Sequence, residues 1–140
     1  VNHTLINWSH CKKQGYGPAW GLTSSDTPKG YAAHSPTEDR GVITPTAALS
    51  AIVYAPQKSM EALQHFKNTM GGRLFGPLGF VDAYQPKSGW IAKDQLAIDQ
   101  GPIIIMIENY RSGLFWKLFM SCPEISKGLK KLGFERVTNE

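Results

Sequence analysis

The sequence has few cysteines and no long apolar run, which limits what this 140-residue chain can be. Cys11 and Cys122 form a lone pair with 110 residues between them, a spacing that matches no disulfide framework. Two free thiols are the favoured interpretation, and a bridge in an oxidising compartment stays open. The longest apolar run, residues 103–107, has five residues, whereas a transmembrane helix needs about twenty. We expect no membrane insertion in this segment.

Signatures of metal and nucleophilic-serine chemistry are also missing. The histidines show no i, i+4 spacing, and no cysteine or carboxylate stands at a motif distance from them. No serine lies in a Gly-x-Ser-x-Gly elbow, and no internal repeat is present. We therefore expect neither a metal nor another cofactor.

The charge balance gives little reason to expect a nucleic-acid partner. Fifteen Lys and Arg against eleven Asp and Glu leave a net charge of +4. Part of the excess is a cluster of Lys127, Lys130 and Lys131 on one predicted helix, which is typical of a solvated face. Basic and aromatic residues do not alternate along one element, as they do in proteins that bind single strands.

The first 45 residues are rich in Gly, Pro, Ser, Thr and Asp, and turn signals recur along them. This composition predicts long irregular structure, and we expect residues 1–8 to form a strand or loop entered in mid-course. Long ordered loops tend to carry function.

From Thr44 onward the pattern favours helices. Pro45 and Pro56 each suit the first turn of a helix, and the second helix is expected to be amphipathic and to end at Gly71. Residues 76–90 predict a loop with short extended pieces. Pro102 then suits the first turn of an apolar helix that reaches Phe119 and is buried on most sides, followed by a short amphipathic helix. One-faced and all-round apolar helices together predict two helical layers.

Four short phrases in chain order combine aromatic or apolar residues with carboxylates, amides and hydroxyls. They are WGLTSSD at residues 20–26, GFVDAY at 79–84, IDQGP at 98–102 and ENYR at 108–111. Aromatic and apolar side chains can lie against the C–H face of a sugar ring, and carboxylates and amides can bond its hydroxyls in pairs. The combination predicts the lining of a sugar-binding cleft.

The order of these phrases resembles the C-terminal half of the glucoamylase-like family of bacterial glycoside hydrolases, which includes endo-β-1,2-glucanases. The resemblance takes in Gly30-Tyr31, TPTAAL at 44–49, GGRLFG at 71–76 and YRSGLFW at 110–116, and it runs from residue 20 to residue 134. The chain departs from the family at Gln95, where members often carry an aromatic residue.

The resemblance implies an all-α fold, part of an (α/α) six-hairpin toroid or barrel, with long irregular loops and short strands at the cleft. Family members are much longer than this chain, which opens on Val1 rather than Met. We therefore expect residues 1–140 to be the C-terminal portion of one glycoside hydrolase catalytic domain whose N-terminal half is absent.

Two carboxylates in this segment are candidates for catalysis, Asp99 and Glu108. Asp99 lies at the predicted start of the apolar helix, where it could cap the helix or, with Gln100, contact sugar hydroxyls at the cleft rim. Glu108 lies further along that helix and either pairs with Arg111 or stays protonated as a general acid. The resemblance implies that the main catalytic carboxylates precede Val1.

Other residues are candidates for substrate binding. Asp26 closes a hydroxyl cluster between Trp20 and Tyr31, and it either forms a local turn or shapes a sugar subsite. Phe80, Asp82 and Tyr84 alternate along an extended backbone and should share one face. The acidic turn around Asp39 is an ordinary surface turn or a loop near the cleft. The predicted binding set is Trp20, Asp26, Tyr31, Asp82, Tyr84, Asp99 and Gln100.

The resemblance implies a glycoside hydrolase that acts on β-glucan, with β-1,2-glucan as the expected substrate. This segment supplies substrate-binding residues and should be inactive alone. Two alternatives stay open: the glycosyl-transferring domain of a cyclic β-1,2-glucan synthase, and a non-catalytic glycan-binding protein. The expected partners are an oligo- or polysaccharide and the remainder of the same domain, and the expected location is the periplasm or the exterior.

Overall fold

The computed structural model describes residues 2–135. The helices are α1 (Asn2–Lys13), α2 (Pro45–Leu49), α3 (Pro56–Asn68), α4 (Ala97–Ser112), α5 (Leu114–Ser121) and α6 (Pro123–Lys131). A 3-10 turn follows α3 at Thr69–Gly72, and two antiparallel pairs join β1 (Phe75–Gly76) to β2 (Gly79–Phe80) and β3 (Tyr84–Gln85) to β4 (Trp90–Ile91). A mostly helical chain with short strands confirms the predicted fold class.

The expectation of a strand or loop at the N-terminus is wrong, because residues 2–13 form α1. The segment has no clear apolar period, and contacts from outside the helix hold it in place. The side chain of Asn7 donates to the Leu22 carbonyl at 3.0 Å and accepts from the Leu22 N–H at 3.1 Å. Cys11, a residue of this helix, is fully buried. The rest of the predicted irregular segment, residues 14–44, contains no helix or strand in the structure.

Both proline-led helices are present, although α2 ends at Leu49 and the sequence pattern continued it to Val53. Pro45 and Pro56 occupy the first turns of α2 and α3, where the missing N–H of proline has no intrahelical acceptor to lose. One side of α3 buries Ala62 and Phe66 while Lys67 stays exposed, which confirms the amphipathic pattern. The side-chain hydroxyl of Ser59 donates to the Ala48 carbonyl at 2.8 Å and joins α3 to α2.

The core lies where α3 meets the two hairpins. The ring of Phe66 packs edge to face against Phe80 and Tyr84, with centroids 6.2 Å and 6.0 Å away. Trp20, Ile43 and Leu74 belong to the same buried cluster. Aromatic pairs of this geometry add about 1 kcal/mol beyond the area that they bury.

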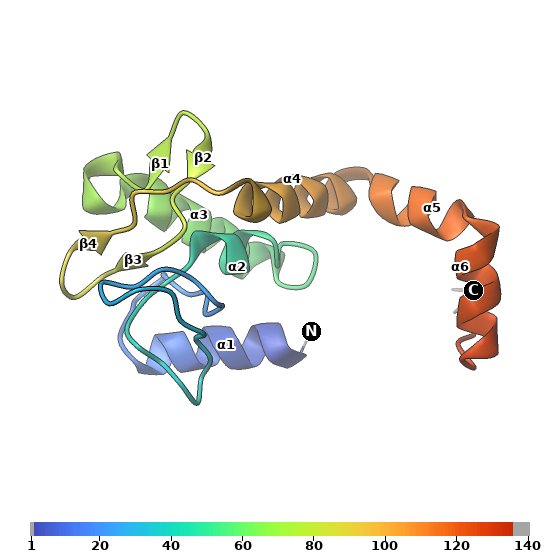
Figure 1. Cartoon of the computed structure of the whole chain (residues 1–140), viewed down its shortest axis with the longest axis horizontal. Helices are drawn as coiled ribbons and strands as arrows, with labels where there is room; N and C mark the ends of the chain where they lie inside the picture. Colours follow the sequence, from blue (N-terminus) through green and yellow to red (C-terminus); the bar gives the residue numbers. More distant parts are fainter. Residues whose placement is uncertain (1, 136–140) are drawn as a thin grey trace.

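The C-terminal helices leave this body as an arm, which we define as residues 104–134 (Figure 1). Gly113, with a φ of 69°, ends α4 and separates it from α5. The single apolar helix that the sequence predicted is therefore two helices. The prediction that this apolar helix is buried on most sides is wrong for the described chain, since α4 buries only Ile103 and Asn109 and α5 buries nothing. The apolar faces of the arm have no covering layer among residues 2–135.

Two further properties concern the apolar content of the helices and the state of the cysteines. Across the described residues, none of the helices has both the length and the apolar content to cross a bilayer. Cys11 is buried and Cys122 is exposed where α6 begins, and both are free thiols.

Candidate functional site

A cleft of about 360 Å³ lies between the loop that follows Trp20, the helix α2 and the first turns of α4. We call it the Asp82–Asp99 cleft. It brings together three predicted residues, Tyr31, Asp82 and Asp99, from separate parts of the chain. Its full lining is Thr23, Ser24, Tyr31, Thr46, Ala47, Ser50, Asp82, Leu96, Ile98, Asp99 and Pro102.

A close backbone approach holds the first loop against α2. The N–H of Thr44 donates to the Gly21 carbonyl at 2.9 Å, and Gly21 has a φ of 126°. A Cβ at Gly21 would lie 2.5 Å from the Thr44 carbonyl oxygen, so this position requires glycine. The hydroxyl of Thr46 donates to the Asp99 carbonyl at 2.8 Å and ties α2 to the start of α4. These contacts fix three walls of the cleft.

Asp82 sits at a bend just before β3 and is 3% exposed. Its carboxylate Oδ2 accepts a hydrogen bond from the backbone N–H of Asp26 at 2.7 Å, and its own N–H donates to the Asp94 carbonyl at 3.0 Å. Burial is the main cause that raises the pKa of Asp82, and the charges of Asp26 and Asp94 raise it further. The Asp26 N–H opposes this shift because it stabilises the ionised form.

Asp99 is the third residue of α4. The helix begins at Ala97, about one turn before the start that Pro102 predicted. Its Oδ2 atom is buried and has no hydrogen-bond partner in the described chain. Burial first, and the neighbouring Asp82 carboxylate second, raise the pKa of Asp99 to about 6. The start of a helix favours a carboxylate, but here desolvation is the larger effect.

The two carboxyls therefore differ in the protonation state that they favour. Two carboxylates that share a poorly solvated site do not ionise together readily. The Asp26 N–H favours the ionised form of Asp82, whereas Asp99 keeps its proton up to about pH 6. The raised pKa of Asp99 thus favours a hydrogen-bond donor at that position, and the bond from the Asp26 N–H favours an acceptor at Asp82.

The rim of the cleft carries apolar and aromatic surface. Tyr31 is 72% exposed and Ile98 is 78% exposed, and both line the same cleft. The turn that presents Tyr31 is closed by reciprocal backbone bonds between Thr27 and Gly30, at 3.0 and 3.1 Å. An exposed ring beside paired carboxyls is an arrangement that can hold a sugar by its C–H face and its hydroxyls.

Asp26 contributes through its backbone. Its N–H holds Asp82, and its side chain is absent from the cleft lining. In the described structure Asp26 thus positions a carboxylate, and the nearby Thr23 and Ser24 line the cleft.

Trp20 and Tyr84 were predicted to bind substrate, but neither lines the cleft. Trp20 is 2% exposed and donates its ring N–H to the Lys58 carbonyl at 3.2 Å, and Tyr84 is fully buried against Phe66. A ring enclosed by the core offers no face to a ligand. Phe80 and Tyr84 do share one side of the chain, as alternation predicted, but that side is the core, and the bend at Asp82 turns its carboxylate away toward the cleft.

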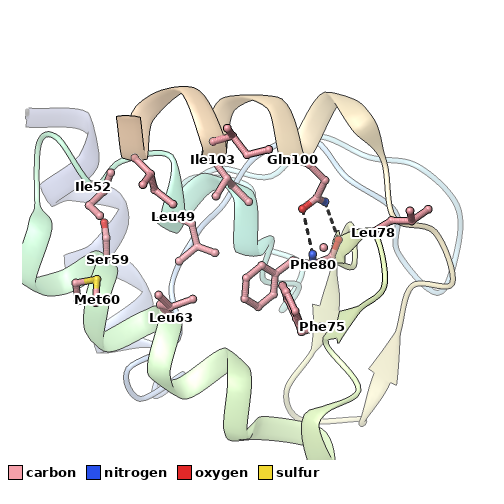
Figure 2. Close-up of a pocket in the computed structure, with 13 residues that line it drawn as sticks. Leu49, Ile52, Ser59, Met60, Leu63, Phe75, Leu78, Phe80, Gln100 and Ile103 are labelled. Carbon is pink, nitrogen blue, oxygen red and sulfur yellow. Dashed lines mark hydrogen bonds between the residues drawn. The ribbon is translucent and has the colours of Figure 1, made fainter. Parts of the chain in front are cut away.

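Gln100, the third such residue, does not line the cleft either, because its side-chain amide is bonded to the β1–β2 hairpin. Figure 2 shows it reaching the β1–β2 hairpin, where Oε1 accepts from the Phe80 N–H at 3.1 Å and Nε2 donates to the Phe80 carbonyl at 2.8 Å. Adjacent residues point about 100° apart on a helix, so Asp99 faces the cleft while Gln100 faces an apolar pocket on the other side. Gln95 supports the same hairpin by donating to the Gly79 carbonyl at 2.6 Å.

Glu108 also lies outside the cleft. Nine residues along α4 from Asp99 correspond to about 13 Å along the helix axis. Its carboxylate accepts from the Ser112 hydroxyl at 2.6 Å and lies 3.6 Å from the guanidinium of Arg111. The predicted Glu–Arg pair is confirmed, and the general-acid alternative for Glu108 is not supported by its position.

Two further hydroxyl-bearing residues line the cleft without having been predicted, Thr46 and Ser50. They lie four residues apart, which places them on the same side of α2. Their i, i+4 spacing was a usable signal once α2 was predicted. Across residues 2–135 no cluster of three or more His, Cys, Asp or Glu side chains could hold a metal ion.

Comparison with known proteins identifies the family of this chain. Residues 1–123 match the sequence model of the family described as Putative glucoamylase. The chain belongs to this family. A curated relative, the exo beta-1,2-glucooligosaccharide sophorohydrolase (non-reducing end) of Parabacteroides distasonis, is 41% identical over 135 residues, which is 91% of this chain and 19% of that protein.

Solved structures of similar proteins match the glucoamylase-family chain closely. A putative glucoamylase from Bacteroides uniformis is 57% identical with a TM-score of 0.88, over 93% of this chain and 33% of that one. The endo-beta-1,2-glucanase from Chitinophaga pinensis, in complex with sophorotriose and glucose, is 52% identical with a TM-score of 0.88, over 94% and 33%. The chain thus spans about a fifth of the curated relative and a third of these solved chains.

Proposed function

We propose that this chain is part of a glycoside hydrolase that acts on β-1,2-glucan and that it binds glucose units in the Asp82–Asp99 cleft. The observation that carries this proposal is the pair of poorly solvated carboxyls beside hydroxyls and an exposed tyrosine. The names of two relatives, a sophorohydrolase and an endo-β-1,2-glucanase, support the linkage.

The residues of the cleft take distinct roles in this proposal. Protonated Asp99 donates a hydrogen bond to a substrate oxygen, and the Asp82 carboxylate accepts one from a glucose hydroxyl. Tyr31 and Ile98 lie against the C–H face of the ring. Hydrolysis of a glycoside requires a proton donor and a second carboxylate that acts as base or nucleophile. Asp99 has the protonation state of a donor, and we propose that further catalytic carboxylates come from the rest of the domain.

The same proposal includes the architecture and the location of the whole enzyme. The helix pairs of this chain would form one side of an (α/α) barrel, and the remaining helices would close the ring over the arm. A polymeric glucan is met outside the cytoplasm, which favours a periplasmic or secreted enzyme. Cell fractionation of the native host would test the location directly.

The decisive experiment is an assay of the full-length protein on linear β-1,2-glucan and on starch, with products separated by chromatography. We expect short β-1,2-linked products and no release from starch. Activity on starch alone would overturn the choice of substrate. Cyclic or elongated products would identify a glycosyl-transferring enzyme, and binding without turnover would identify a non-catalytic glycan-binding protein.

The role of Asp99 is tested with Asp99→Asn, using Glu61→Gln on the exposed side of α3 as a matched carboxylate control. Loss of proton transfer would lower kcat by a factor of roughly 10² to 10⁴. Loss of one hydrogen bond to substrate would raise KM by about tenfold and leave kcat nearly unchanged. Parental kinetics in Asp99→Asn would remove the carboxyl from the proposed site.

A further inference from the structure

One side chain of α1 holds the loop that leads into the cleft. Asn7 donates from Nδ2 to the Leu22 carbonyl at 3.0 Å, and its Oδ1 accepts from the Leu22 N–H at 3.1 Å. We call these two bonds the Asn7 clamp. Leu22 is 6% exposed, and a buried backbone group that loses its partner is destabilising. The clamp therefore satisfies both backbone polar groups of a buried residue fifteen positions away.

The orientation of the Asn7 amide is fixed from within α1. Cys11 lies one turn further along the helix, and its thiol donates to Asn7 Oδ1 at 3.6 Å. Burial raises the pKa of this thiol to about 11, so the sulfur keeps its proton and stays a donor at neutral pH. Oδ1 thus accepts two bonds, and Nδ2 is left to face the Leu22 carbonyl. The amide has one orientation in which all these bonds are made.

The two residues that follow Leu22 line the cleft without anchors of their own. Thr23 and Ser24 belong to the lining of the cleft, and neither makes a hydrogen bond within residues 2–135. We call them the Thr23–Ser24 wall. The next fixed point is Ser25, which exchanges backbone bonds with Ala32 at 3.0 Å. The position of the wall is therefore set by its two neighbours, and on the N-terminal side that neighbour is held by the clamp.

We propose that Asn7 is a positioning residue for the cleft, because it fixes the Thr23–Ser24 wall against which a glucose unit binds. The same loop continues to Asp26, whose N–H holds the Asp82 carboxylate at 2.7 Å. This inference rests on the proposed function of the cleft. It gives a part in substrate binding to α1, a helix that contributes no residue to the cleft lining.

The test is the steady-state kinetics of the full-length protein with Asn7→Ala on β-1,2-glucooligosaccharides. Without the clamp the Thr23–Ser24 wall is free to move, which removes binding that the substrate and the transition state share. We expect KM to rise roughly five- to tenfold while kcat stays within about twofold of the parent's. A parental KM would overturn the proposal even if the variant melts at a lower temperature, because Asn7 would then serve stability alone.

The matched control is Tyr16→Phe, which also removes hydrogen bonds near α1. The Tyr16 hydroxyl donates to both carboxylate oxygens of Asp39 at 3.0 Å, and neither residue lines the cleft. This variant should melt at a lower temperature and keep the parental KM. An equal rise of KM in Tyr16→Phe would overturn the proposal, because the rise would then follow from lost stability.

A milder variant covers the case in which Asn7→Ala does not fold. Asn7→Ser retains a hydroxyl that can hold at most one of the two Leu22 groups. Its KM should rise by roughly two- to threefold, in the same direction as for Asn7→Ala. A parental KM in Asn7→Ser would then overturn the proposal.

A second measurement separates this inference from the proposed function. Backbone hydrogen exchange is followed without substrate in the full-length parent, in the Asn7 variant and in Tyr16→Phe. Faster exchange over residues 22–32 than over α3, in the Asn7 variant alone, supports the positioning role even if the parent hydrolyses no glucan. Exchange that is unchanged, or that rises equally in both segments, overturns this role even if the parent is an active β-1,2-glucanase.

Discussion

Replacing Asp99 by asparagine is expected to stabilise the full-length protein above about pH 6 while it impairs the cleft. The parent must ionise a carboxyl whose Oδ2 atom is buried without a partner beside Asp82. An asparagine at this position has no charge to desolvate, and its amide can donate to the Asp82 carboxylate. Residues that serve a site at the expense of stability commonly behave in this way.

The size of the effect follows from the pKa of Asp99, about 6 against an ordinary 3.8. The folded state binds more protons than the unfolded state between these values, so the free energy of unfolding falls as pH rises through that window. A difference of about two units corresponds to about 3 kcal/mol. Because solvent reaches part of the side chain, we reduce this to about 1–2 kcal/mol.

Thermal melting from about pH 4 to about pH 7.5 measures the difference, with Glu61→Gln as the control. Asp99→Asn and the parent should melt together near pH 4, and the variant should melt roughly 2–6 °C higher above pH 6. A difference that does not change with pH, or an asparagine variant that is less stable near neutrality, would refute the argument from burial.

Three further predictions concern other parts of the molecule. Tyr31→Ala should raise KM for β-1,2-glucooligosaccharides by roughly tenfold with little change in melting temperature, since the ring is 72% exposed; an unchanged KM would remove the tyrosine from the site. Asp39 accepts hydrogen bonds from the Tyr16 hydroxyl and the Gly41 N–H, lies 2.7 Å from His10, and has a lowered pKa. In urea unfolding, Asp39→Asn should therefore lower the free energy of unfolding by about 1–2 kcal/mol at neutral pH, and this cost should shrink as pH falls below the ordinary pKa of the group and vanish once pH passes its lowered pKa. An equal cost at neutral and at acidic pH would contradict this. Residues 1–140 expressed alone should associate or bind hydrophobic dyes, because the arm exposes apolar side chains widely; a monomer with one cooperative melting transition by light scattering and calorimetry would contradict the expectation.

The helices that could be predicted are those with strong local signals. Pro45 and Pro56 mark helix starts through their fixed φ and missing N–H, and the result does not depend on the rest of the chain. The helix α1 lacks such a signal, and the contacts of Asn7 with Leu22 that hold it cross from a distant segment. Local patterns cannot report a stabilising contact of that kind.

The site was predicted in part, for a related reason. Carboxylates such as Asp82 and Asp99 are costly to bury, so a sequence that places them in apolar surroundings indicates a special environment. Aromatic rings give no such indication, because Trp20 and Tyr84 are equally suited to a core and to a sugar platform, and the structure puts both in the core. Asp99 and Gln100 are neighbours in sequence, and only their angular positions on the helix decide that one lines the cleft and the other the apolar pocket.

The two hydrogen bonds between Gln100 and Phe80 connect a glycine of the β1–β2 hairpin to the helix that carries Asp99. A Cβ at Gly79, whose φ is 116°, would collide with the amide of Gln100. Relief of that collision would displace the Gln100 side chain and break its two hydrogen bonds to Phe80, which tie the hairpin to the first turn of α4 that carries Asp99. Variants selected for altered glucan preference could therefore carry changes at a position that never meets the sugar, and a screen confined to cleft-lining positions would overlook them.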